Sequence, residues 1–148
     1  MTDIPKIIPI AADHAGYNLK EFIKQQLTEK GFQIIDMGTY SAEPVDYPDV
    51  IHPLAAAINA GKYPIGIIMC GSGNGVAMTA NKYPLVRCAL CWNEELAQLA
   101  RNHNNANILS LPARFISQEQ ALNIALTFLQ SDFENGRHQK RIDKIPIH

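Results

Sequence analysis

The sequence predicts an α/β fold, a parallel β-sheet of five strands with helices covering both of its faces. Two observations lead to this prediction. Five short apolar stretches of strand length alternate with five stretches whose apolar residues recur at helical spacing. One short stretch, Ile65–Met69, is apolar apart from a single glycine, as is typical of a strand buried on both faces. We therefore expect three layers, helix, sheet and helix, within a single domain over residues 1–148.

The first half of the chain alternates strand and helix signals. Gly31 and Gly61 end the two helical stretches, because glycine adopts the left-handed conformation that closes a helix. Pro9 lies within the first strand, where it cannot donate a hydrogen bond, and this conflicts with a central position in the sheet. The expected elements are a strand over Lys6–Ala12, a helix over Tyr17–Lys30, a strand over Phe32–Met37 and a helix from Asp49, its N-cap, to about Ala60.

In the second half, the helix starts carry the clearest signals. Asn93 is an expected N-cap because two glutamates follow it in the first turn. Ser117 and Gln120 have the spacing of a capping box. The expected elements are a strand over Ile65–Met69, a short helix from near Val76, a strand over Arg87–Cys91, a helix from Asn93 to about Asn105, a strand over Ile108–Leu111, a helix from Ser117 past Phe128, and a basic tail helix.

The turn after the central strand, Cys70–Gly75, predicts an anion-binding site. It reads Cys-Gly-Ser-Gly-Asn-Gly and lies between a strand and a helix start. Glycines let the backbone approach a ligand, while the free N–H groups and the helix dipole favour negative charge. The same field favours the thiolate form of Cys70. This pattern suits a base or nucleophile beside an oxyanion; the alternative is a tight turn with a buried cysteine.

Spacing excludes several familiar sites. The glycine turn lacks the Gly-Lys-Ser/Thr of a P-loop and the final spacing of a dinucleotide fingerprint. Val76 occupies the position where the loop of a cysteine phosphatase has its arginine. Cys88 and Cys91 form a C-x-x-C pattern within a predicted strand, where they point to opposite faces, so we expect core residues and not a redox dithiol. No clustered metal ligands are evident, so no metal site is expected.

Composition limits the partners and the location. The 148 residues carry a formal net charge of −1, which argues against nucleic acid and anionic membranes as partners. No apolar run is long enough to span a bilayer, and the N-terminus does not resemble a signal peptide. We therefore expect a cytoplasmic protein with three reduced cysteines.

Polar residues adjoin three of the predicted strands. Asp13 and His14 follow the first strand, the glycine turn follows the third, and residues 103–107 lead into the fifth. Ligands bind at the carboxyl ends of strands in such sheets, so we expect these groups to meet there. Arg137 and Arg141 are four residues apart, hence on one side of a helix, and paired guanidinium groups suit a phosphate monoester.

Six motifs spread over nearly the whole chain agree with one another. They are Ala-Asp-His-Ala-Gly at 12–16, Asp-Tyr-Pro-Asp at 46–49, the glycine turn at 70–75, Ala-Asn-Lys at 80–82, His-Asn-Asn-Ala-Asn at 103–107 and Gly-Arg-His-Gln-Lys-Arg-Ile at 136–142. Together they resemble the B-type ribose-5-phosphate isomerases, a family that also contains the galactose-6-phosphate isomerase subunits. The resemblance implies a flavodoxin-like three-layer fold and an aldose–ketose isomerase without metal or cofactor.

The resemblance also implies roles for individual residues. Cys70 would accept the proton, and His103 would be the acid that helps to open the sugar ring. One branch of the family has a carboxylate at the position of Val76, so this chain resembles the branch that uses a thiol. The sugar would be held by Asp13, His14, Gly71, Ser72, Gly73, Asn74, Gly75 and Asn104, the phosphate by Arg114, Arg137 and Arg141, and Tyr47 would line the pocket.

The expected activity is interconversion of ribose 5-phosphate and ribulose 5-phosphate. The alternatives are an isomerase of a hexose 6-phosphate, such as allose or galactose 6-phosphate, and a phosphate-binding module without turnover. By resemblance, Arg137 and Arg141 favour the pentose enzyme. The tail that carries them has little core of its own to bury, so we expect it to pack on a partner. This predicts a homodimer with shared active sites, and pairing of dimers into a tetramer is a further alternative.

Overall fold

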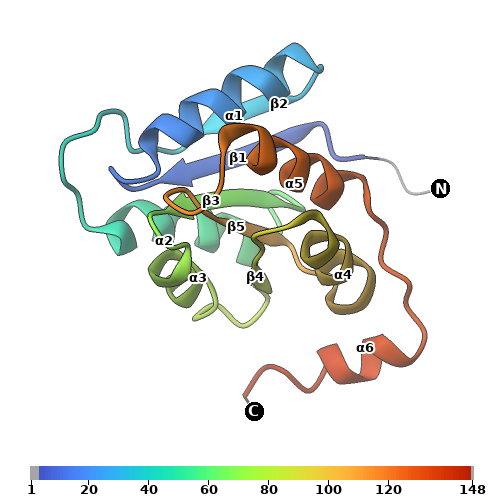
Figure 1. Cartoon of the computed structure of the whole chain (residues 1–148). Coiled ribbons are helices and arrows are strands. Elements are labelled where there is room, and N and C mark those ends of the chain that lie inside the picture. Colours follow the sequence, from blue (N-terminus) through green and yellow to red (C-terminus); the bar gives the residue numbers. More distant parts are fainter. Residues whose placement is uncertain (1–3, 148) are drawn as a thin grey trace.

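A computed structural model describes residues 4–147 of the chain, in which five strands form one parallel sheet in the order β2-β1-β3-β5-β4 (Figure 1). The strands are β1 (Ile7–Ala12), β2 (Gln33–Asp36), β3 (Gly66–Cys70), β4 (Cys88–Leu90) and β5 (Ile108–Pro112). The helices are α1 (Tyr17–Glu29), α2 (Tyr47–Asn59), α3 (Asn74–Ala80), α4 (Glu94–Asn104), α5 (Gln118–Gln130) and α6 (Arg137–Ile142). The predicted α/β class is confirmed.

Two separate hydrophobic cores show that helices cover both faces of the sheet. Alternate residues of β1 and β3 point to opposite sides, since Ile67 and Met69 pack with α1, α4 and α5, whereas Ile68 and Cys70 pack with α2 and α3. All five residues of β3 are buried, as expected for the central strand. The helices therefore form one layer on each face of the sheet, which is the predicted three-layer arrangement.

The strand order departs in one respect from the flavodoxin-like order, which is 2-1-3-4-5. The first three strands follow it, but β5 lies between β3 and β4. The register joins Gly66 to Ile108 at one end of β3 and Cys70 to Pro112 at the other. This exchange places the loop after β5 directly beside the glycine turn.

Pro9 is accommodated within a strand that has neighbours on both sides. The carbonyls of Lys6 and Ile10 accept hydrogen bonds from the β2 side, from Gln33 and Met37. By alternation, the nitrogen of Pro9 faces β3, whose pairing with β1 begins only at Ile10. The missing donor therefore lies just outside the ladder, and the predicted strand is confirmed.

Two predicted helix caps are confirmed and one is wrong. Asn93 accepts from the Leu96 N–H at 2.8 Å, and Ser117 forms the expected capping box with Gln120. Asp49 does not cap α2, because that helix begins at Tyr47, with Asp46 as its N-cap residue. Pro48 favours the earlier start, since its fixed φ suits the first turn and its missing N–H costs nothing there.

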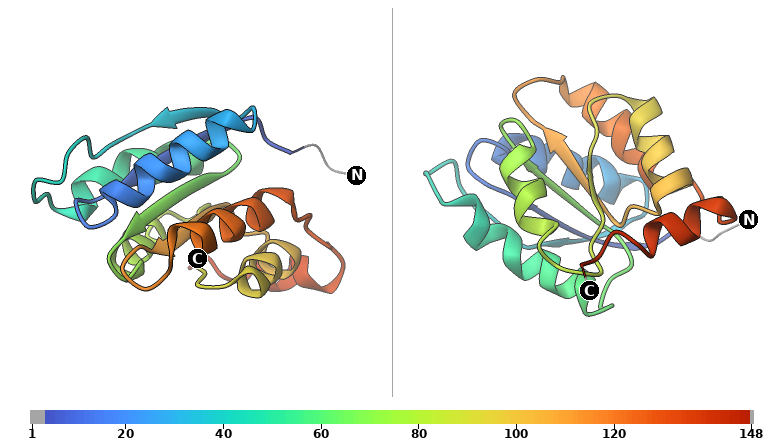
Figure 2. Two further views of the ribbon diagram at one scale, coloured as in Figure 1. Left: turned by 45° about the horizontal axis from the view of Figure 1, so that its top comes forward. Right: turned by 90° about the horizontal axis from the view of Figure 1, so that it is seen from below.

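The C-terminal segment leaves the three layers. After α5 it runs along the outside of the molecule, and α6 packs next to α4 at the margin (Figure 1, Figure 2). Its first helical residue, Arg137, follows Gly136, and the expected tail helix is present. Within residues 4–147, no helix is both long enough and apolar enough to cross a bilayer.

Candidate active site

The glycine turn holds Cys70 at the carboxyl end of the central strand. The Cys70 side chain is 6% exposed, and its Sγ accepts a hydrogen bond from the Gly73 N–H at 3.2 Å. Gly73 is in the left-handed conformation, with φ of 78°, and α3 begins immediately after it. The Gly73 N–H is therefore placed where it can donate to the sulfur of Cys70.

Ser110 anchors the same turn from the neighbouring strand. Its side chain is fully buried in β5 and donates a hydrogen bond to the Gly73 carbonyl at 2.7 Å. A Cβ at Gly73 would collide with the Leu90 side chain and come within 3.1 Å of the Ser110 hydroxyl. Ser110 is not among the site residues predicted from the sequence. Its signal was a hydroxyl within an otherwise apolar buried strand, which requires a partner.

Arg114 lies against the glycine turn, as the strand exchange allows. Its N–H donates to the Gly71 carbonyl at 3.0 Å, and the N–H of Ala113 donates to the Cys70 carbonyl at 2.9 Å. A Cβ at Gly71 would lie only 3.2 Å from the Arg114 Cδ. The structure therefore brings together the thiol, the glycine turn and one of the three predicted phosphate ligands.

Asp13 and His14 lie at the carboxyl end of the adjacent strand, since Ala12 pairs with Met69. The Asp13 carboxylate accepts from the N–H groups of Ala15 and Gly16, at 2.9 and 3.1 Å, and is 7% exposed. His14 Nδ1 accepts from the Val45 N–H at 3.1 Å, which leaves Nε2 to carry the proton of the neutral ring. Both residues therefore lie at the carboxyl ends of the strands, as Cys70 does.

The Tyr47 side chain reaches the same end of the sheet from the start of α2. Its ring lies against Gly75, where a Cβ would come within 2.5 Å of the ring carbon Cζ. The Tyr47 side chain is partly exposed, at 39%. Ser72 and Asn74 complete the turn, with the Asn74 N–H donating to the Ser72 hydroxyl at 3.2 Å. Close ring packing at residue 75 requires the glycine.

A second group of predicted site residues lies elsewhere. His103, Asn104, Arg137 and Arg141 line one pocket of about 460 Å³ between α4 and α6. His138, Ile142 and Ile145 complete its lining. Arg137 and Arg141 therefore share a pocket with His103.

The two groups lie at opposite ends of the parallel strands, the first at the carboxyl ends and the second at the amino ends. The prediction that residues 103–107 meet the other polar residues at the carboxyl ends is therefore wrong for a single chain. The Gly66 N–H donates to the Asn107 carbonyl at 2.9 Å, which places residues 103–107 at the amino end of β3. Gly66 and Cys70 are four residue steps apart in an extended strand, which is about 13 Å. The reason is connectivity, because a segment that leads into a parallel strand lies at its amino end.

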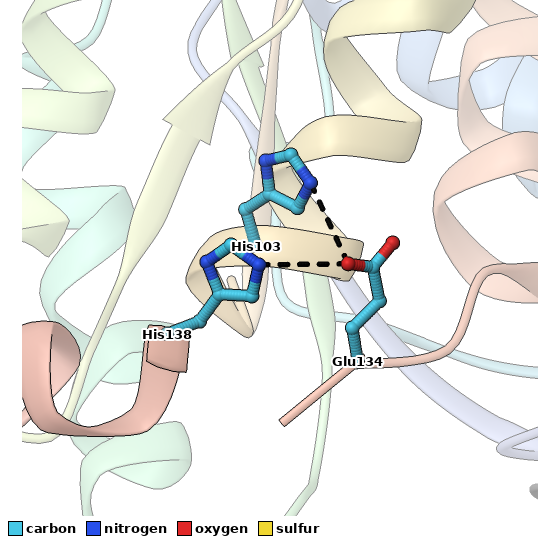
Figure 3. Close-up of side chains that lie close together, drawn as sticks. All are labelled: His103, Glu134 and His138. Atoms are coloured by element: carbon cyan, nitrogen blue, oxygen red, sulfur yellow. Dashed lines mark ion pairs between the residues drawn. The ribbon is translucent and has the colours of Figure 1, made fainter. Parts of the chain in front are cut away.

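A cluster of three side chains, His103, Glu134 and His138, borders the second pocket (Figure 3). The Glu134 Oε1 lies 3.7 Å from the His103 Nε2 and 3.5 Å from the His138 Nε2. The imidazole rings stack at 4.4 Å between centroids, with 15° between their planes. The sequence did not predict this cluster, because two of its members lie in the tail, far along the chain from His103.

The C-x-x-C pair behaves as core, as predicted. Cys91 packs in the core of α1, α4 and α5, whereas Cys88 packs against the core on the opposite face. Burial raises the pKa of the Cys91 thiol to about 12, and burial together with the neighbouring Cys91 raises the pKa of Cys88 well above its ordinary value. Thiols held protonated in this way are poor nucleophiles.

The comparisons with known proteins agree with one another. A family model described as Ribose/Galactose Isomerase matches residues 8–145. Ribose-5-phosphate isomerase B of Escherichia coli is 39% identical over 140 residues, which covers 95% of this chain and 94% of that protein. A probable ribose-5-phosphate isomerase B of Mycoplasma genitalium is 45% identical over 139 residues, covering 92% and 91%.

Solved structures give the same result. Ribose 5-phosphate isomerase from Thermotoga maritima superposes with a TM-score of 0.93 at 48% identity, covering 95% of this chain and 97% of that one. Ribose-5-phosphate isomerase B from Mycoplasma genitalium, solved with bound ribulose-5-phosphate, has a TM-score of 0.89 at 43% identity, covering 94% and 93%. These matches confirm the resemblance found in the sequence motifs. The chain therefore belongs to the ribose/galactose isomerase family.

Proposed function

We propose that this chain is an aldose–ketose isomerase that interconverts ribose 5-phosphate and ribulose 5-phosphate. Family membership supports the reaction class, and the relative from Mycoplasma genitalium was solved with ribulose-5-phosphate bound. The observation that carries the proposal is the Cys70 thiol, which accepts an N–H hydrogen bond inside a glycine turn at the end of the central strand. A base beside backbone donors is what proton transfer next to a carbonyl requires.

The chemistry starts from the open-chain sugar. The Cys70 thiolate removes the proton from C2, and the electron pair moves to form an enediolate whose negative charge rests on oxygen. Backbone N–H groups of residues 71–75 stabilise that charge. The hydroxyl proton then passes from O2 to O1, and the thiol returns the carbon-bound proton to C1, which completes the shift of the carbonyl from C1 to C2. Asp13 and His14 would hold the sugar hydroxyls, and Tyr47 would form the pocket wall.

Ring opening and phosphate binding are assigned to the second group. The His103 imidazole would move a proton between the ring oxygen and the C1 hydroxyl, a step for which histidine is well suited. Asn104 would hydrogen-bond the sugar beside it. Arg137 and Arg141, with Arg114 from the first group, would bind the phosphate, and this remote binding energy would orient C1 and C2 over the thiol.

We propose that the two groups combine across a homodimer. One chain holds the two groups at opposite ends of its parallel strands, so a second copy would supply the group that each site lacks. Three large apolar side chains are exposed near the edge strand β4, namely Met78 on α3, Leu85 before β4 and Trp92 after it in the chain. Burial of these side chains against a two-fold related copy would favour dimerisation.

The location and domain organisation complete the proposal. We infer a cytoplasmic enzyme, because Cys70, Cys88 and Cys91 are all free thiols, as suits a reducing compartment. Each subunit would act as one domain over residues 1–148. A protein organised in this way needs no cofactor for the proposed proton transfer.

One assay distinguishes the candidate functions. The purified protein is given ribose 5-phosphate, then allose 6-phosphate and galactose 6-phosphate, and formation of each ketose is followed. We expect the highest kcat/KM with ribose 5-phosphate, unchanged after exhaustive chelation. A preference for a hexose phosphate would identify the hexose enzyme, and binding without turnover of any sugar would identify a phosphate-binding module.

A further inference from the structure

We propose that His103, Glu134 and His138 form a binding site for zinc(II), and that an ion bound there inhibits the enzyme. The binding site stands on the geometry of the cluster alone. The inhibition rests on the proposed function, because it depends on the role of His103 in opening the sugar ring.

Two of the three separations between donor atoms are close to those of a tetrahedral ion. Zinc binds imidazole nitrogen and carboxylate oxygen at about 2.0–2.2 Å, so two donors at the tetrahedral angle lie about 3.3–3.5 Å apart. The Glu134 Oε1 lies 3.5 Å from the His138 Nε2 and 3.7 Å from the His103 Nε2. All three donor atoms lie within 4.8 Å of one another. The imidazole rings, which stack with 15° between their planes, must tilt for both Nε2 lone pairs to point at one ion.

The same distances are too long for direct hydrogen bonds. An N–H···O bond spans about 2.7–3.2 Å between heavy atoms, so neither imidazole is paired well with the carboxylate. Both Nε2 atoms nevertheless point toward the same oxygen, Glu134 Oε1 (Figure 3). Both nitrogens therefore lie beside one carboxylate oxygen without a good hydrogen bond to it, and an ion bound among the three groups would use all of them.

The cluster is assembled by three different parts of the chain and is held in place. His103 lies in the last turn of α4, and His138 lies in α6, where it is only 7% exposed. The Glu134 N–H donates to the Asn102 carbonyl at 2.9 Å, which fixes the connecting segment against α4. Stacking of the two imidazole rings keeps both Nε2 atoms beside the same carboxylate. Such preorganisation lowers the cost of collecting the ligands.

The donor set selects the class of metal. Two imidazoles and one carboxylate suit zinc and its neighbours among the transition metals, whereas calcium and magnesium prefer oxygen ligands. A fourth position stays open toward the pocket, where water could occupy it. Arg137 and Arg141 line that pocket and repel a cation, so we expect reversible binding and not a structural metal.

A bound ion would compete with the proposed chemistry. Zinc would occupy the lone pair on the His103 Nε2, so that nitrogen could neither accept nor donate the proton needed for ring opening. It would also tie His103 to the tail segment that carries Arg137 and Arg141. The expected effect is reversible inhibition, relieved by a chelator, and stronger on cyclic ribose 5-phosphate than on proton exchange of ribulose 5-phosphate, which has no ring.

The binding test uses the full chain and zinc itself, by competition with a chromophoric chelator. Glu134→Gln and His138→Gln should each weaken zinc binding by at least about tenfold, as loss of a ligand does. Glu29→Gln, which changes an exposed carboxylate at the end of α1, should leave it unchanged, and so should Cys70→Ala. Circular dichroism confirms that each variant is folded. The absorption spectrum of bound cobalt(II) gives a second readout, because its intensity reports four-coordination.

Two binding outcomes would overturn the site. One is equal zinc affinity for wild type and Glu134→Gln. The other is loss of binding in Cys70→Ala alone, which would assign the zinc to the thiol.

The inhibition test measures isomerase activity against zinc concentration, with each variant compared to its own uninhibited rate. Glu134→Gln should shift the inhibiting concentration upward by at least about tenfold, and Glu29→Gln should not. Zinc binding at the cluster without inhibition would overturn the inhibitory role and leave the site standing. Absence of isomerase activity in the zinc-free protein would instead refute the proposed function, and the binding test would still decide the site.

Discussion

At the scale of single residues, the central feature is one thiol among three. Cys70 accepts a backbone N–H at the end of β3, whereas Cys88 and Cys91 lie in the sheet core with raised pKa values. The difference arises from the turn, because the left-handed Gly73 directs its N–H at the sulfur. In the proposed mechanism, Cys70 serves proton transfer, whereas Cys88 and Cys91 serve packing.

We expect Cys70→Ala to lower kcat by about 10²–10⁴, the usual contribution of a positioned base. Binding of ribose 5-phosphate should persist, because the arginines remain. The measurement is steady-state kinetics together with calorimetric binding of the sugar phosphate. Cys91→Ala is the matched control and should retain kcat, since its thiol faces the core. Joint loss of activity and binding in Cys70→Ala would instead indicate a structural cysteine.

At the scale of elements, the glycine turn depends on both conformation and space. Gly73 and Gly61 have nearly the same φ, 78° and 77°, but a Cβ would meet Leu90 and Ser110 at Gly73 and nothing within 4 Å at Gly61. The pair therefore separates the cost of left-handed backbone from the cost of crowding.

We expect Gly61→Ala to lower the free energy of unfolding by about 1–2 kcal/mol, the cost of the left-handed conformation for alanine. Gly73→Ala should lower it further, because Leu90 must move, and it should also reduce kcat by displacing the N–H that faces Cys70. Urea unfolding and steady-state kinetics test this. Equal stability of the two variants would show that the turn relaxes without cost.

A second element-scale feature is an ion-pair network beneath the first helix. The fully buried Lys20 Nζ lies 2.7 Å from the Asp36 Oδ2, and the Lys24 Nζ lies 3.0 Å from the same oxygen. The Gly38 N–H donates to the other carboxylate oxygen at 3.0 Å. Burial raises the pKa of Asp36, but the hydrogen bonds from Lys20, Gly38 and Lys24 outweigh it and hold the pKa below its ordinary value.

We expect Asp36→Asn to reduce the free energy of unfolding at pH 7 by about 1–3 kcal/mol, since it weakens the pairing of a buried charge. A carboxyl whose pKa is lowered by folding stabilises the protein above its unfolded pKa of about 3.9, and this is lost as the pH falls below that value. The difference from wild type should therefore shrink between pH 7 and pH 3. Glu43→Gln, in an exposed loop, is the control. A difference that did not change with pH would refute the assignment.

At the scale of the whole molecule, the question is how the Cys70 group and the His103 group can act together, since they lie at opposite ends of the parallel strands. The exchange of β4 and β5 makes the short β4 an edge strand, next to α3. Met78 on α3 and Trp92, which follows β4 in the chain, are both exposed. A two-fold axis there would place Cys70 of each copy near Arg141 of the other.

We expect two inactive parents, Cys70→Ala and Arg141→Ala, to recover activity when they are unfolded and refolded together. In a mixed dimer, one site would carry both lesions and the other none. Random pairing makes about half of the dimers mixed, so roughly a quarter of all sites should regain activity under two-fold symmetry. Each parent refolded alone is the control. No recovery, with mixed dimers established by mass spectrometry, would show that the sites are not shared.

Local signals in the sequence predicted most of the elements. Asn93 and Ser117 marked helix starts because capping is decided within four residues. The cap of α2 was misplaced, since Asp46 and Asp49 are equally good caps and only the position of Pro48 decides between them. The short motifs also identified the family, which the comparisons confirmed.

The sequence by itself determined the α/β class, the alternation of strands and helices, and the turn that holds Cys70, because each depends on neighbours along the chain. The tertiary structure decided the strand order, the anchoring of Gly73 by Ser110, the separation of His103 from Cys70, and the meeting of His103 with Glu134 and His138. These features join residues many positions apart. Their energies depend on how the helices and strands pack, and no local pattern of residues specifies that.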